Sequence, residues 1–295
     1  MIRLVKIFLI VLCVMINTAC AGDLWAVKVT VVDEGGRPIE DADVLLTFLL
    51  SEGANQYAGV TTEKGVVTAI RRGALQLIVE ATKEGYYETF FKGSQGSQEV
   101  IVVLREQKNP IPMYAKKSRL WKGKNDFEGK WVGYDLIASD YVPPYGKGLY
   151  ADFEFNTNYD KQDMWNYRFD LAVRFPNEGD GLLPYKVKDY TSKLKSDYIA
   201  PDSGYERFLK YFEYRAGSDM APDTNLDRSR KYYFRVRTKM DEDGDVISAL
   251  YGKLYGEFPD LNYYLNPNEN DRNIEFDPKQ NLFLKLPPEE RQFEP

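Results

Sequence analysis

Short apolar runs separated by glycine turns fill residues 24–107 of this 295-residue chain. Val27, Val29 and Val31 alternate with polar side chains, which is the period of a β-strand with one buried face. Turns are expected at Asp33–Gly36 and at Gly65, and a polar loop is expected over residues 51–57. Because the chain reverses so often, we expect this part to be a small all-β sandwich.

The order of these turns is similar to that of a known family. The matching positions are Asp33, Gly36 with Pro38, Ala42 with Val44, Thr62 with Gly65, Gly73 with Leu75 and Leu77, and Gly85 with Tyr86. Residues 24–107 resemble the carboxypeptidase regulatory-like domain, a seven-stranded, transthyretin-like or Ig-like sandwich. Three positions depart from the family pattern, with Glu63 in place of aspartate, Leu75 in place of tyrosine and Asp41 in place of glycine. The resemblance implies a fold and a supporting role as an adaptor, but no particular ligand.

Residues 1–21 have the layout of a secretory signal peptide. Arg3 and Lys6 precede an apolar run, and small residues follow it, with Ala19 and Ala21 forming a cleavage motif. Alternatively, the segment resembles a bacterial lipoprotein signal in which Cys20 receives the lipid. We therefore expect an exported protein, periplasmic or extracellular, that contacts a membrane only if Cys20 is lipidated.

Composition excludes several kinds of chemistry. The chain contains no histidine, and its two cysteines, Cys13 and Cys20, both lie in the signal segment. A catalytic triad, a histidine base and a histidine-containing zinc site are therefore excluded for the mature protein. The net charge of -6 argues against a nucleic-acid partner. We expect no cofactor, and we expect a glycan, a peptide or another envelope protein as the partner.

A second, larger β-rich domain is expected over residues 114–288, after a proline-containing linker at 108–113. Alternation over 148–155 and 165–175 predicts strands, and the acidic turn at 241–245 predicts a hairpin. We expect a β-sandwich or jelly roll, with a frayed tail at 289–295.

At most one or two short helices are expected in this domain. The main candidate follows Ser203, where the aromatic and apolar residues have helical spacing. These residues are Tyr205, Phe208, Leu209 and Phe212. Phe208, Phe212 and Tyr214 also fit the alternation of a strand, so both interpretations stay open.

An aromatic-rich stretch in the second domain suggests a binding surface. It contains Trp121, Trp131, Tyr134, Tyr141 and Tyr145. Flat rings with a polar group stack well against sugars and peptides. The alternative is that these rings fill and trim the core of a sandwich, which is the commoner role of large aromatic residues.

Carboxylates provide two further candidate sites. Asp241, Asp243 and Asp245 resemble the start of a calcium loop, but Val246 and Gly252 stand where such a loop needs glycine and glutamate. An acidic hairpin turn is the simpler interpretation.

The second candidate is catalytic. Asp135, Asp140, Asp152 and Glu154 lie near the aromatic stretch, and two of them could serve glycoside hydrolysis if they faced each other across a cleft. Solvated charges on a strand are the default interpretation. We predict an exported, non-catalytic binding or structural adaptor protein of the bacterial cell envelope. The alternative is a carboxylate-dependent glycoside hydrolase on a jelly-roll domain.

Overall fold

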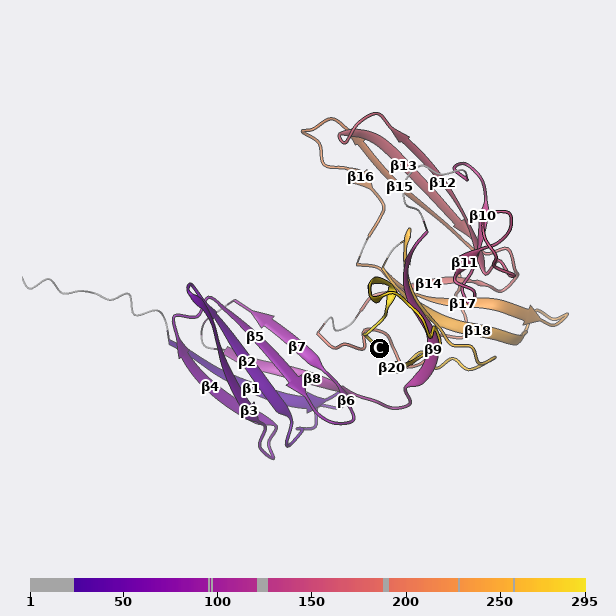
Figure 1. Ribbon diagram of the computed structural model, residues 1–295. Helices are drawn as coiled ribbons and strands as arrows, with labels where there is room; N and C mark the ends of the chain where they lie inside the picture. Colours follow the sequence, from indigo (N-terminus) through magenta and orange to yellow (C-terminus); the bar gives the residue numbers. More distant parts are fainter. Residues whose placement is uncertain are drawn as a thin grey trace, which may run out of the picture. The chain divides into compact units, whose positions relative to one another are not determined.

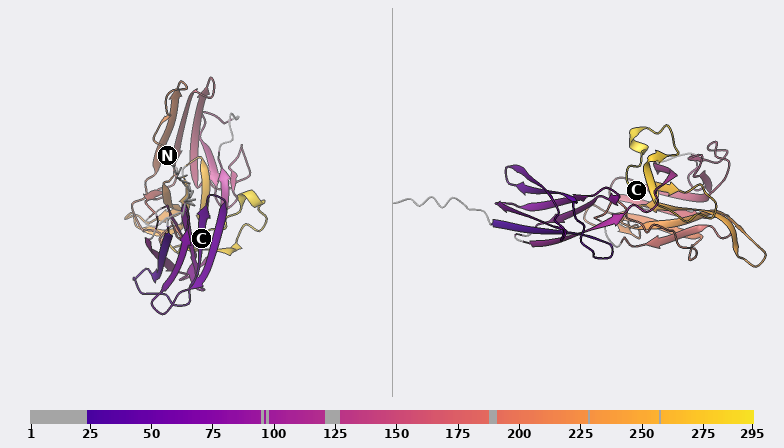
Figure 2. Two further views of the ribbon diagram at one scale, coloured as in Figure 1. Left: turned by 90° about the vertical axis from the view of Figure 1, so that its left-hand side faces the viewer. Right: turned by 90° about the horizontal axis from the view of Figure 1, so that it is seen from below.

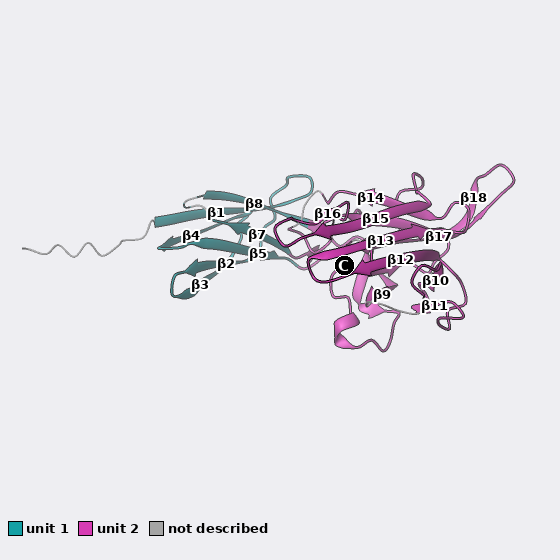
Figure 3. Cartoon of the chain, turned by 90° about the horizontal axis from the view of Figure 1, so that it is seen from above, with its two compact units in different colours: residues 1–83, 89–104 teal, residues 84–88, 105–295 magenta. Residues whose placement is uncertain are grey.

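The computed structural model describes residues 24–94, 96, 98–120, 127–187, 191–227, 229–256 and 258–295. The signal segment, Cys20 and Trp121 lie outside these residues. The chain divides into two compact units, coloured separately in Figure 3. The first unit contains the residues up to Lys83 and Thr89–Leu104. The second unit contains Glu84–Glu88 and Arg105–Pro295. Apart from the 3-10 turn η1 (Pro288–Glu290), every regular element in the described residues is a strand, which confirms the all-β prediction (Figure 1).

The N-terminal sandwich consists of two four-stranded sheets, ordered β4-β1-β8-β6 and β3-β2-β5-β7. Its strands are β1 (Leu24–Asp33), β2 (Asp43–Leu50), β3 (Gly53–Val60), β4 (Val66–Arg72), β5 (Gln76–Thr82), β6 (Tyr86–Tyr87), β7 (Thr89–Gly93) and β8 (Gln98–Glu106). The short strand β6 belongs to the second unit. Strand β3 replaces much of the polar loop expected over residues 51–57, because β2 and β3 pair along their whole length.

Strand β1 has one buried face, as the alternation of its residues predicted. Trp25, Val27, Val29 and Val31 are buried, whereas the residues between them are mostly exposed. Burying a side chain of this size contributes on the order of 1.5–3 kcal/mol. Gly65 has a φ of +70°, and a Cβ atom there would collide with the main-chain oxygen of Val31. Only glycine fits this turn beside β1.

The second unit contains two six-stranded sheets, ordered β11-β10-β12-β13-β15-β16 and β14-β17-β18-β19-β9-β20. Their strands are β9 (Ile111–Arg119), β10 (Val132–Asp135), β11 (Asp140–Tyr141), β12 (Phe153–Lys161), β13 (Asn166–Arg174), β14 (Gly181–Tyr185), β15 (Phe208–Ala216), β16 (Asp223–Thr224), β17 (Lys231–Met240), β18 (Val246–Tyr255), β19 (Asp260–Leu265) and β20 (Phe276–Asn281). The predicted hairpin is confirmed as β17 and β18, and its tip projects from the sheet in Figures 1 and 2.

The sheet that contains β17 and β18 is covered on both faces. On one face, Phe234 and Leu254 join the core between the two sheets. On the other face, Tyr233 and Tyr251 pack with Ile274 and other residues of the segments that follow β14 and β19. Strand β18 is therefore buried along both faces, as its unbroken run of buried residues from 248 to 255 shows.

Several local predictions were wrong. The proposed helix is strand β15, whose residues 208–216 pair fully with β13, so the strand alternation decides. Residues 148–152 form a loop before β12, because hydrogen bonds to the Asp135 carboxylate hold them. Strand β9 begins at Ile111, inside the expected linker, and it pairs with β19 and β20. The tail is not frayed, since Gln292 is buried and its amide donates to the main-chain oxygen of Lys116.

Among the described residues, no helix is long and apolar enough to cross a membrane.

Candidate functional site

Three of the aromatic residues predicted to bind ligand instead pack inward. Tyr134 is 3% exposed and lies in the core. The Tyr141 hydroxyl donates to the main-chain oxygen of Leu120 at 2.6 Å, and burial raises the pKa of Tyr141 to about 12. The ring of Tyr145 packs edge-on against Phe127, at a centroid distance of 5.4 Å. The alternative core interpretation therefore holds for all three rings.

Trp131 differs from these residues because it faces outward. Its side is set by β10 and β12, which pair Val132 with Phe155 and so place Trp131 beside Asn156. The Arg174 guanidinium lies over the Trp131 ring, 4.1 Å from its centroid. Arg174 also forms an ion pair with Glu154, at 2.5 Å. Trp131 is 37% exposed in this setting, and one face of the sheet therefore carries an accessible ring held by an arginine.

This outward side of β12, β13 and β15, which lie next to one another in Figure 1, is called the outer face below. The register places its residues in rows across the three strands. The outer face consists of Trp131, Glu154, Asn156, Asn158, Asp160, Arg168, Asp170, Ala172, Arg174, Phe208, Lys210, Phe212 and Tyr214.

The outer face carries rings along β15 and at Trp131, and planar polar groups on β12 and β13. Phe208 is 47% exposed and Tyr214 is 44% exposed, and six residues of strand separate them by about 20 Å. Arg168 and Asp170 form a two-point pair at 2.7 and 2.8 Å. Rings can stack on the apolar side of a sugar, while carboxylate, amide and guanidinium groups bind its hydroxyls. The surface is long enough to contact several sugar units.

The sequence did not predict that the rings of β15 belong to a binding surface. Phe208, Phe212 and Tyr214 share one face because they are separated by even numbers of residues. Their alternation was visible, but a helix that accounts for Phe208 and Phe212 competed with it. Pairing with β13, which is distant in the sequence, decides between the two.

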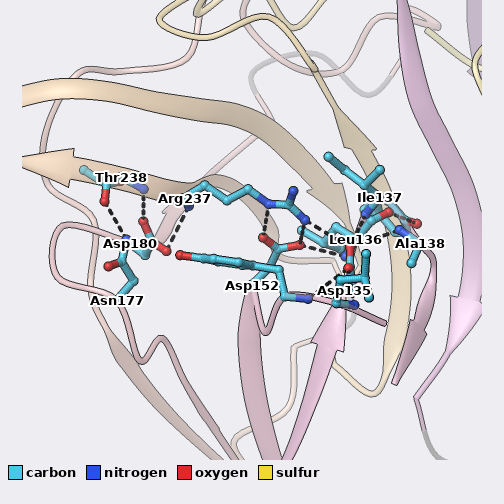
Figure 4. Close-up of polar contacts among 12 residues, drawn as sticks. Asp135, Leu136, Ile137, Ala138, Asp152, Asn177, Asp180, Arg237 and Thr238 are labelled. Carbon is cyan, nitrogen blue, oxygen red and sulfur yellow. Dashed lines mark hydrogen bonds and ion pairs between the residues drawn. The ribbon is translucent and has the colours of Figure 1, made fainter. Parts of the chain in front are cut away.

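Two of the four candidate carboxylates meet at a single arginine (Figure 4). Arg237 contacts Asp152 through Nε and Nη2, at 2.8 and 3.1 Å, and Asp135 through Nη2 at 3.0 Å. Its φ of +58° lies in the left-handed region, beside an irregular register between Val236 and Lys239. This bulge turns the arginine side chain toward the two carboxylates.

Burial and hydrogen bonding affect the two carboxyl groups differently. Asp152 is fully buried, and burial raises its pKa although Arg237 opposes the shift. Burial also acts on Asp135, but main-chain N–H groups and Arg237 outweigh it and lower the pKa. Asp152 accepts the main-chain N–H group of Leu136, and Asp135 accepts those of residues 137, 138, 149 and 150. They therefore hold two loops to Arg237.

The other carboxylates of the aromatic region are also occupied. Asp140 accepts the main-chain N–H groups of Tyr141 and Lys147, at 2.8 and 2.9 Å. Glu154 pairs with Arg174 on the outer face. In the described residues, each of the four candidates thus has a cationic or N–H partner.

The acidic turn closes the β17–β18 hairpin. The Asp241 carboxylate accepts the main-chain N–H groups of Asp243 and Asp245, at 3.1 and 2.8 Å. Gly244 has the positive φ that such a turn requires. No group of three or more metal-ligating side chains occurs in the described part of the chain. The arrangement matches the hairpin-turn interpretation.

Comparisons with known proteins add little to this picture. No protein-family model matches the chain, and no curated protein matches it. Among solved structures, 3-chlorocatechol 1,2-dioxygenase from Rhodococcus opacus 1CP is similar over 30% of this chain and 61% of its own, with 13% identity and a TM-score of 0.26.

Proposed function

We propose that this chain is an exported, non-catalytic binding protein of the bacterial cell envelope that holds a glycan on its outer face. The first unit is then a carboxypeptidase regulatory-like adaptor, consistent with its sandwich of paired sheets. The observation that carries the proposal is the exposure of Trp131, Phe208 and Tyr214 on one face of a sheet whose other face is core.

The charges of the outer face favour a neutral glycan. Glu154, Asp160 and Asp170 are balanced by three cationic residues of the same face, Arg168, Lys210 and Arg174. Two of the cations already pair with carboxylates of the same face. A strongly charged ligand would find no excess of opposite charge there, whereas a neutral sugar could stack on the rings and use the remaining hydrogen-bonding groups.

A face is also a better site for a sugar than for an extended peptide. The backbone groups of β13 pair on both sides, with β12 and β15, so no free row of N–H and C=O groups is available for strand addition at this position. Recognition must use side chains alone, and this is how stacking on rings works.

The rival function, a glycoside hydrolase, needs an acid and a base or nucleophile on opposite sides of a sugar. Asp135 and Asp152 instead share one arginine. Of the four candidate carboxylates, Glu154 is the one that lies on the outer face. Glu154 pairs with Arg174, whose guanidinium lies over the Trp131 ring, and this favours a role in holding Trp131.

The test is affinity electrophoresis of the mature chain through gels that contain neutral polysaccharides, such as xylan, glucomannan or mixed-linkage glucan. Trp131→Ala and Tyr214→Ala should each weaken retardation by about tenfold, because an interface residue that dominates binding contributes more than about 1 kcal/mol.

Trp165→Ala is the matched control. Trp165 is 38% exposed and lies under Arg215 at 4.2 Å, nearly the same environment as Trp131. It precedes β13, however, and Arg215 alternates with the outer-face residues of β15, so Trp165 lies off the outer face. Equal retardation of all three variants and the parent would contradict the proposal. Release of reducing sugar that disappears in Glu154→Gln would support the hydrolase instead.

A further inference from the structure

An open pocket of about 500 Å³ lies in the second unit, at the margin of the sheet that contains β17 and β18. A volume of this size is typical of sites for small ligands. Lys117, Lys231 and Tyr255 line it. They continue the rows of Ala115 and Tyr233, which are buried under the covering segments. The pocket is therefore the part of this sheet face that the covering segments leave open.

Three ammonium groups face the pocket, and two of them have no anionic partner. Lys195 pairs with Glu294 at 2.6 Å. In the described part of the chain, the Nζ atoms of Lys117 and Lys231 form no hydrogen bond or ion pair. They lie near rings instead, with Lys231 at 5.7 Å from the centroid of Tyr255 and Lys117 at 5.9 Å from that of Phe293.

The carboxylates of the pocket wall form their ion pairs with other cations than Lys117 and Lys231. Asp260 pairs with Arg119, at 3.3 Å, and Glu294 pairs with Lys195. Lys231 is half-buried, and its pKa is lowered by burial first and by the nearby charge of Lys195 next, while the charges of Glu294 and Asp227 oppose the shift. Positive charge in a concave, partly dry site attracts anions more strongly than the same charge on an open surface.

A buried hydroxyl gives a second, independent indication. Tyr264 lines the pocket and is fully buried, and its hydroxyl has no hydrogen-bond partner among the described residues. Buried polar atoms nearly always have a partner in the protein, in water or in a ligand. Burial raises the pKa of Tyr264, and the charges of Tyr255 and of Glu294, both of which line the same pocket, add to the shift.

We propose that this pocket binds a small anionic ligand through a phosphate or carboxylate group. Lys231 and Lys117 contact the anion, and Glu294 is the internal carboxylate that competes with it for Lys195. Two or more ammonium groups suit a dianion. The inference does not depend on the outer face, which belongs to the other sheet of this unit.

The test is isothermal titration of the mature chain, at constant ionic strength, with inorganic phosphate in one arm and malonate in the other. Saturable binding in either arm is expected, and the arm that binds identifies the anionic group. Lys231→Gln should weaken it at least tenfold, because a hydrogen bond to a charged group is lost.

Lys231→Arg should restore binding, and this shows that loss of charge rather than misfolding weakens Lys231→Gln. Lys239→Gln is the control, because Lys239 is exposed on the same strand and only loosely paired with Glu269, at 3.6 Å.

Glu294→Gln gives the sharpest outcome. Removing this carboxylate frees Lys195 and should tighten binding of the same anion several-fold, whereas a merely solvated set of lysines would not respond. The proposal is overturned if neither phosphate nor malonate saturates the parent chain, or if Lys231→Gln binds as the parent does.

Discussion

Replacement of Lys253 by methionine tests how a buried lysine affects the stability of this fold and its pH dependence. Lys253 lies in β18 on the covered face, fully buried, with its Nζ atom 3.1 Å from the Ser196 hydroxyl. Burial lowers the pKa of Lys253 well below its usual 10.5. Glu275 opposes this shift and Arg105 adds to it. The folded chain therefore holds the Lys253 proton less tightly than the unfolded chain does.

The sign of the pH dependence follows from proton binding. Between the lowered pKa and 10.5, the unfolded chain holds one more proton at Lys253 than the folded chain does. In this range, the free energy of unfolding rises by about 1.4 kcal/mol per pH unit. This gain in stability is lost again as the pH falls toward the lowered pKa. Lys253→Met removes this rise of stability with pH, together with the cost of releasing the Lys253 proton on folding. It forfeits the hydrogen bond to Ser196, worth about 1 kcal/mol, and the contacts of Nζ with the rings of Tyr255 and Tyr264.

The measurement is urea unfolding of Lys253→Met and the parent at pH 7, 8 and 9. The variant should be the more stable at pH 7, and its advantage should shrink by as much as about 2.7 kcal/mol by pH 9. Lys239→Met, at an exposed site, should leave the slope of the parent unchanged. Parallel pH profiles for Lys253→Met and the parent would refute the reasoning, because Lys253 would then keep its proton in the folded state.

Three other perturbations test separate parts of the second unit. Arg237→Gln should lower the free energy of unfolding by about 3–5 kcal/mol, because the Asp152 carboxylate then stays buried without its cation. A second change, Asp152→Asn, should recover part of that loss. Urea unfolding of both variants measures the two effects. Gly252→Ala should cost about 3 kcal/mol or more, since the added Cβ would collide with the Phe234 ring and with main-chain oxygen; an unchanged melting temperature would count against the packing described here. Millimolar calcium should leave the amide NMR signals of the 241–245 turn in place, because the Asp241 carboxylate already accepts two N–H donors; saturable shifts there would restore the metal site.

The sequence predicted best where a pattern is local. The alternation of Val27, Val29 and Val31 indicated a strand with one buried face, and the acidic turn indicated the β17–β18 hairpin. Each of these depends on neighbours within a few residues. The helix expected at 203–217 failed because its residues satisfy two periods at once, and only pairing of β15 with β13 selects one.

The candidate sites show the same division. Trp131 could be named from the sequence, but its side of the sheet could not, because the register between β10 and β12 decides whether a ring faces the core or the solvent. Tyr134, only three residues further on, is buried for the same reason. Arg237 carried no sequence signal as a partner of Asp152, since 85 residues separate them.

By itself, the sequence determined the all-β character of the chain, the glycine turns of its first sandwich and the exclusion of histidine chemistry. These properties depend on residue type and short-range spacing, which the chain carries in any conformation. Only the tertiary structure decided which rings share the outer face, which carboxylates share Arg237 and which lysines line one pocket. Such groupings arise when strands distant in the sequence pair in a particular register, so that proximity belongs to the fold rather than to any segment.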